Sequence, residues 1–198
     1  MTKRTWNLVS LLLICASLLL LCGCSATWVG ALAAGLPTLL GMVTGIAAFI
    51  AALIGKTIPA DVSTEMQTIT GDVDTELQNA ESLISQYQSA PGTNLIAQIQ
   101  AILTGVIAKL GSILSGFNIT DPETLSKLTV MIGLAVEAAQ ALLALIPLLT
   151  AAALQPSGPA LAALRSYHSN LKKAWNNIVS AKTGNPDVDA ALANVKRF

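Results

Sequence analysis

The chain is poor in charge, aromatic side chains and histidine, and these shortages exclude several kinds of function. Only 11% of its 198 residues are charged, 4% are aromatic, and the formal net charge is zero. A nucleic-acid partner is therefore not expected, because such binding normally needs a basic surface. The single histidine, His168, cannot form a histidine-based metal site alone, and we expect it to be a solvated surface residue.

Familiar catalytic and ligand-binding motifs are also missing. The sequence has no phosphate-binding loop, no dinucleotide-binding glycine pattern and no H-E-x-x-H zinc pattern. Asp72, Asp74 and Glu76 resemble the start of a calcium loop, but the glycine precedes them and the twelfth position is Leu83. We therefore predict no catalytic residue, no metal site, no cofactor and no enzyme activity.

What the chain has in abundance is apolar sequence with helical spacing. Hydrophobic residues make up 53% of it, and the alternation typical of a strand is nowhere sustained. The sequence predicts an all-α fold, a bundle of about five helices with a central apolar helix. Residues 24–198 are long enough to form this bundle as a single domain with one core.

The N-terminus has the three zones of an export signal. Lys3 and Arg4 precede the uncharged apolar run Leu8–Leu21, and small residues with a cysteine follow it. The run has the length of a signal-peptide core and is short for a transmembrane helix. We therefore expect export from the cytoplasm.

The stretch Leu21-Cys22-Gly23-Cys24 resembles the lipobox of bacterial lipoprotein precursors. In that family Leu stands at the third place before the cut, a small residue stands just before it, and Cys follows it. The resemblance implies that Cys24 is the lipidation site, because a cut before Cys22 would place the bulky Leu21 at the small position. It covers only about the first 25 residues and implies no fold.

The resemblance implies both processing and location. Residues 1–23 are then a cleaved signal peptide, and Cys24 carries a diacylglycerol and often a further fatty acid such as palmitate. Two or three acyl chains, at about 0.8 kcal/mol per buried CH2, hold a protein on membrane lipid almost irreversibly. Ser25 after the cysteine favours the outer membrane in a bacterium with two membranes, with the protein facing the periplasm or the exterior. The mature chain keeps no other cysteine, so no disulfide is expected.

The segment Trp28–Ile54 is apolar on every side and long enough to cross a bilayer. Pro37 is expected to kink or split this helix, and Gly41 and Gly45 form a G-x-x-x-G pair that permits a close contact. The other helices are expected at 61–87 with a break at Gly71, 95–117, 120–154 with an interruption at Pro147, 161–179, and shortly after 186.

The charge pattern argues against a membrane crossing by residues 28–54. The segment after them is acidic, which contradicts the positive-inside tendency of cytoplasmic loops. We therefore expect these residues to form the core of the bundle. The alternatives are a membrane-embedded form, in which residues 130–154 also enter the bilayer, and an oligomer that buries the apolar helices between chains.

Two polar features have a simple and a more specific interpretation. Glu137 is a lone carboxylate in an apolar helix, and we expect it to face solvent or to pair with Lys109 or Lys127. Within lipid it would instead be a functional residue. The acidic segment 61–81 and the basic segment after Arg165 are expected to be solvated faces that attract one another. The basic segment could otherwise contact anionic lipid or a partner.

The sequence thus predicts a lipid-anchored, non-enzymatic helical protein of the bacterial cell envelope with a structural or interaction role. It leaves open a membrane-inserted or channel-forming protein, and a carrier of an apolar ligand between helices. It also leaves open whether the partner besides membrane lipid is another protein or a second copy.

Overall fold

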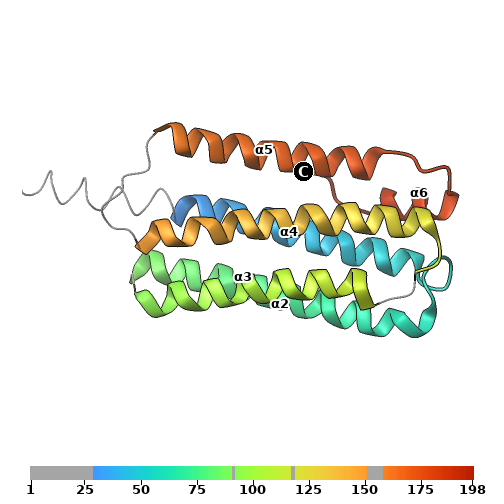
Figure 1. The fold of residues 1–198 in the computed structure, drawn as a ribbon, viewed down its shortest axis with the longest axis horizontal. Coiled ribbons are helices and arrows are strands. Elements are labelled where there is room, and N and C mark those ends of the chain that lie inside the picture. The colour runs from blue at the N-terminus through green and yellow to red at the C-terminus, as the bar shows by residue number, and fades with distance from the viewer. Residues whose placement is uncertain (1–28, 91, 117–118, 151–157) are drawn as a thin grey trace, which may run out of the picture.

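The computed structural model describes residues 29–90, 92–116, 119–150 and 158–198, which fold into an all-α bundle. An N-terminal helix, Val29–Leu53, is followed by α2 (Ala60–Ser89), α3 (Thr93–Gly116), α4 (Pro122–Thr150), α5 (Gly158–Ser180) and the short α6 (Pro186–Ala193). The long helices lie along a common axis and successive ones run in opposite directions (Figure 1). The prediction of an all-α bundle of about five helices is confirmed.

The N-terminal helix is the central member of the bundle. It contacts α2 through Thr44, α4 through Gly35, and α5 through Thr38. Ten of its hydrophobic side chains are buried, most of them completely: Val29, Leu32, Leu36, Leu39, Met42, Val43, Ile46, Phe49, Ile50 and Leu53. A helix that is apolar on nearly every side suits this position, because its neighbours remove most of it from water.

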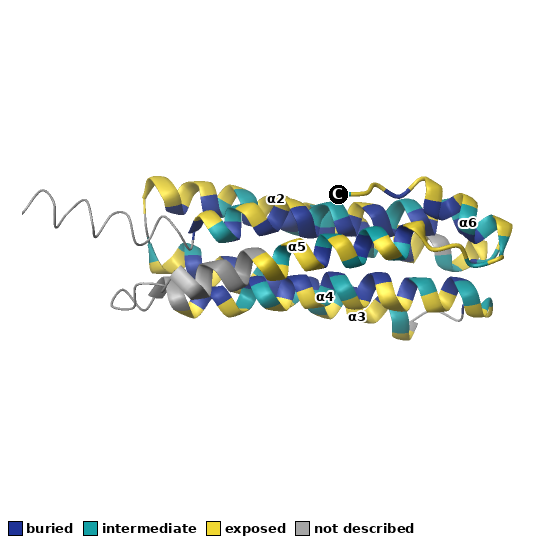
Figure 2. Ribbon diagram, turned by 90° about the horizontal axis from the view of Figure 1, so that it is seen from above, coloured by how far each residue is buried: buried dark blue, intermediate teal, exposed yellow. Residues whose placement is uncertain are grey.

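None of the three predicted interruptions ends a helix. The N-terminal helix continues through Pro37, α2 through Gly71 and α4 through Pro147. A mid-helix glycine costs about 1 kcal/mol relative to alanine, and tertiary packing of the buried face commonly outweighs such a preference. Figure 2 shows that the long helices alternate buried and exposed positions along their length.

Side-chain hydrogen bonds cap the start of α4, at Asp121, and of α6, at Asn185. The Asp121 carboxylate accepts a hydrogen bond from the backbone N–H of Thr124 at 2.8 Å. Hydrogen bonds from Thr124 also lower the pKa of Asp121. The Asn185 side chain accepts from the backbone N–H groups of Asp187 and Val188 at 3.0 and 3.4 Å. These bonds satisfy donors that a helix start leaves unpaired.

In the part of the chain that the structure describes, three helices are long and apolar enough to cross a membrane: Val29–Leu53, Thr93–Ser115 and Pro122–Pro147. The bundle buries 56% of the most apolar stretch of the first, 33% of the second and 44% of the third. The bundle therefore buries a larger share of the N-terminal helix than of the other two helices.

Candidate functional site

Cys24, the predicted lipidation site, lies outside the described residues. The described chain begins five positions later, at Val29, which is buried at one end of the bundle. The predicted signal peptide, residues 1–23, also lies outside the described residues.

The predicted G-x-x-x-G pair is closely packed, and α5 and the tail (residues 194–198) occupy it. A Cβ atom at Gly45 would stand 2.6 Å from Cζ2 of Trp175 and 3.0 Å from Cγ1 of Val195. A Cβ atom at Gly41 would stand 2.8 Å from the ring of Phe198. The prediction of a close contact is confirmed, and its partners are an indole ring of α5 and the tail.

Hydrogen bonds hold the tail in this position. The indole N–H of Trp175 donates to the Lys196 carbonyl at 3.0 Å. The Asn176 amide donates to the Phe198 carbonyl at 2.8 Å and accepts from the Phe198 N–H at 2.9 Å. The Lys172 ammonium lies 5.6 Å from the centre of the Phe198 ring, within the range of a cation–π interaction. The tail is therefore part of the folded bundle.

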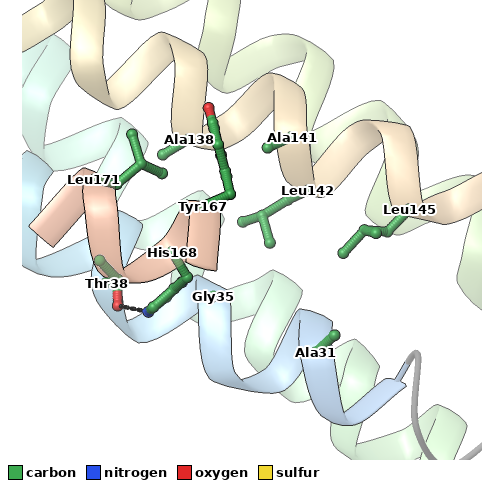
Figure 3. A pocket seen from close by; sticks show the side chains of 10 residues that line it. All are labelled: Ala31, Gly35, Thr38, Ala138, Ala141, Leu142, Leu145, Tyr167, His168 and Leu171. Atoms are coloured by element: carbon green, nitrogen blue, oxygen red, sulfur yellow. Dashed lines mark hydrogen bonds between the residues drawn. The ribbon is translucent and has the colours of Figure 1, made fainter. Parts of the chain in front are cut away.

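A small hollow lies where the N-terminal helix, α4 and α5 meet (Figure 3). Its volume is about 30 Å³, and most of its lining is apolar: Ala31, Gly35, Thr38, Ala138, Ala141, Leu142, Leu145, Tyr167, His168 and Leu171. That space admits little more than a water molecule, whereas ligand pockets usually measure about 300–1,000 Å³. This hollow does not suit the predicted carrier of an apolar ligand.

His168 is the polar centre of this hollow, and the prediction of a solvated surface histidine is wrong. The ring is partly buried, and its Nε2 lies 2.9 Å from the hydroxyl oxygen of Thr38, which is itself buried. No carboxylate lines the hollow to orient the ring as in a catalytic triad. Thr38 and Thr44 are the two hydroxyl-bearing residues of the N-terminal helix, which is the sequence feature that could have suggested a polar partner for this helix.

The environment of His168 predicts a specific pH dependence of stability. Burial, and then the nearby charge of Lys172, lower the pKa of His168 below its ordinary value of about 6.5. The unfolded chain then binds the proton more tightly, so the free energy of unfolding falls as the pH drops through about 6.5. The loss stops below the lowered pKa, where both states are protonated.

Urea unfolding at pH 7.5 and pH 5.0 checks this expectation. The His168→Gln variant, which can still hydrogen-bond Thr38, should lose less stability than the wild type between the two pH values. A wild type that gains stability over the variant on acidification would contradict the assignment, because it would mean that the fold favours the imidazolium.

The calcium-like cluster on α2 is engaged in ion pairs and hydrogen bonds. The Lys109 ammonium of α3 lies 2.9 Å from Glu76 and 3.6 Å from Asp72, and the hydrogen bond to Glu76 raises the pKa of Lys109. Asp74 accepts hydrogen bonds from Gln78 at 2.8 Å and from Thr44 at 3.4 Å. The ion-pair partner of Asp72 and Glu76 on α2 is therefore Lys109 of α3, and not a residue of the basic segment after residue 165.

Glu137 is exposed on α4, as one of its two interpretations predicts, and neither proposed lysine pairs with it. Lys109 is engaged by α2, and the Lys127 ammonium donates to the carbonyls of Ile178 and Ala181 at 3.2 and 3.0 Å. Lys127 therefore satisfies acceptors at the end of α5, where helix carbonyls lack backbone partners.

No known family pattern, curated protein or solved structure matches this chain. A functional assignment therefore has to rest on the residues of the chain and on their geometry. Within the described ranges, no three side chains of the His, Cys, Asp and Glu types are grouped as metal ligands.

Proposed function

We propose that the protein is a lipid-anchored, non-enzymatic helical bundle of the bacterial cell envelope with a structural or interaction role. The Leu21–Cys24 stretch supplies the anchor chemistry. The observation that carries the proposal is the position of the Val29–Leu53 helix in the bundle. Contacts with α2, α4, α5 and the tail bury ten of its hydrophobic side chains, so folding accounts for its composition without a bilayer.

The position of the anchor relative to the fold supports the same proposal. Four residues, Ser25 to Trp28, separate Cys24 from the first residue of the central helix. A lipid on Cys24 would therefore tether one end of the bundle to the membrane. The long sides of the helices would remain available for contacts in the periplasm or outside the cell, which suits an interaction role.

The absence of an enzyme activity is also a proposal, supported by the chemistry of the His168 hollow. A nucleophile needs a base and room for a substrate atom. The Thr38 hydroxyl is buried, and the hollow of about 30 Å³ leaves no room for a substrate beside it.

A membrane-inserted protein is the second candidate, because three helices among the described residues have the length and composition of membrane spans. In that form α3 and α4 would face lipid, together with the N-terminal helix. Glu137 would then lie in an apolar environment, where an ionisable side chain is costly and usually functional.

The lipid anchor is tested on the natively expressed full chain. Mass spectrometry of the membrane fraction should find residues 1–23 removed and lipid mass on Cys24. Cys24→Ala should abolish both, whereas Cys22→Ala should leave both unchanged, since a small residue still stands at that place. A wild-type chain that keeps residues 1–23 and carries no lipid would exclude the proposal.

A leader exchange separates the bundle from the membrane-inserted alternative. Residues 1–24 are replaced by a cleavable secretory signal peptide without a lipobox, so that residues 25–198 are exported without lipid. We expect this protein in the soluble fraction, because its apolar helix is covered by its own chain. Retention in the pellet after an alkaline carbonate wash would favour insertion instead.

A further inference from the structure

The cover of the central helix is incomplete along one strip, which we call the seam. Its members alternate in steps of four and three residues: Gly30, Ala34, Pro37, Gly41, Thr44, Ala48 and Ala51. Five of them are exposed, Ala48 is partly buried, and Gly41 is partly covered by Phe198 of the tail. Alternating steps of three and four give the 3.5-residue repeat with which two helices pack along their length.

An open groove follows the seam between the N-terminal helix and α2. One part, of about 240 Å³, lies between residues 33–37 and residues 81–88. The other, of about 450 Å³, lies between residues 43–51 and residues 67–74. Gly71 of α2 borders the second part, and a Cβ atom there would meet nothing within 4 Å. Small side chains on the floor let another helix approach closely.

Charges of opposite sign flank the seam. On one side, Asp74 and Glu81 of α2 line the two parts of the groove. On the other side lies the tail, whose Val195 and Phe198 contact the central helix at Gly45 and Gly41. Between these two contacts stand Lys196 and Arg197, both exposed.

Asp74 lies at the level of the bundle where the tail contacts the central helix, and these charges are not neutralised by ion pairs among the described residues. Asp74 hydrogen-bonds to Thr44, within the turn of the central helix that the tail contacts. Among the described residues, Asp74, Glu81, Lys196 and Arg197 form no ion pair. A partner seated on the seam should therefore present cations to α2 and carboxylates to the tail, and a second copy of this chain carries both.

We propose that two copies of this chain associate through the seam as a parallel two-fold dimer, with the symmetry axis along the bundle. A two-fold interface brings the same patch of both subunits together. Rotation about an axis along the helices places the tail of each copy over α2 of the other. Lys196 and Arg197 then meet Asp74 of the partner copy twice, once on each side of the seam.

The opposite orientation is disfavoured by the same charges. A two-fold axis across the helices would place tail on tail and α2 on α2, so that like charges meet. The parallel arrangement also puts both Val29 ends on the same side, where two lipid anchors could enter one membrane. The charges alone favour the parallel orientation, whether or not Cys24 carries a lipid. The dimer therefore goes beyond the proposed function, and its test does not depend on that function.

Charge reversal across the interface gives the sharpest test. Differently tagged full-length chains are co-expressed and extracted in mild detergent, and copurification reports association. Asp74→Arg alone and Arg197→Asp alone should each weaken self-association by roughly tenfold, since each dimer gains two like-charge contacts. Mixing the Asp74→Arg chain with the Arg197→Asp chain should restore association, because both contacts are then between opposite charges.

The matched control reverses charges away from the seam. Glu137 and Lys182 are exposed on α4 and just beyond α5. Glu137→Arg and Lys182→Asp should leave copurification at the wild-type level. The proposal is overturned if the seam variants behave like these controls, or if the mixed pair associates no better than either variant alone.

Disulfide trapping tests the direction of the two chains. Ala34→Cys, Thr44→Cys and Ala51→Cys are made separately in the full chain and oxidised in native membranes. In a parallel dimer each seam cysteine lies opposite the same cysteine of the partner copy. Their Cα atoms are then within the 7 Å that a disulfide tolerates, so all three variants should form disulfide-linked homodimers. Ala108→Cys, exposed on α3, is the control and should remain monomeric.

Two trapping results would overturn the proposal. An antiparallel pair would trap at most the seam cysteine nearest its axis. A different protein partner would give products of other masses and no homodimer.

Discussion

Replacing Trp175 with Ala should lower the free energy of unfolding by about 3–5 kcal/mol, the usual cost of deleting a buried aromatic side chain. The indole is completely buried, packs on the central helix at Gly45, and lies 6.2 Å from the Phe198 ring between centroids. Its N–H also bonds to the Lys196 carbonyl. The substitution therefore opens a cavity and removes a bond that holds the tail.

Urea unfolding followed by far-ultraviolet circular dichroism measures this loss. Trp175→Phe keeps an aromatic ring but lacks the N–H, so it should cost less than the alanine variant. Tyr167→Ala is the matched control on the same helix, because that side chain is 38% exposed and should cost far less. Equal losses for Trp175→Ala and Tyr167→Ala would show that the tail contact contributes little.

Replacing Gly45 with Ala should destabilise the protein by about 1–3 kcal/mol, the typical cost of overpacking a core. Alanine favours a helix by about 1 kcal/mol over glycine, so propensity alone predicts the opposite sign. The new methyl group would overlap the Trp175 ring and touch Val195. The ring cannot move aside easily, because its N–H is bonded to the tail.

Gly133→Ala provides the matched control. Gly133 is exposed within α4, and a Cβ atom there meets nothing within 4 Å, so this variant should be stabilised by about 0.5–1 kcal/mol. Gly45→Ala should also cost less in a Trp175→Phe chain, because neighbouring substitutions are not additive. Two glycine variants that shift stability in the same direction would contradict the close contact at Gly45.

Much of the fold could be predicted from the sequence because it depends on local spacing. Apolar residues in steps of three and four indicated the long helices, and the Asn185-Pro186 pair indicated that a short helix follows α5. The central place of the N-terminal helix followed from its lack of a polar face. These features depend on residues close together in the chain.

The contacts that complete the fold could not be predicted, because they join residues far apart in the chain. Thr38 and His168 are separated by 130 positions, and nothing near either residue specifies the other. The glycine pair at 41 and 45 indicated a close contact but could not name Trp175 and Phe198 as its occupants. The break expected at Gly71 and the split expected as one alternative at Pro37 do not occur, because tertiary packing outweighs the local preference of these residues.

The order of synthesis gives the position of the central helix a further consequence. This helix leaves the ribosome before the elements that cover it, and its cover at Gly41 and Gly45 comes from residues 175–198. At about 5–20 residues per second, some 130 residues correspond to a delay on the order of ten seconds. During translation this apolar helix therefore lacks its native cover, and its exposed surface favours aggregation until the tail has been made.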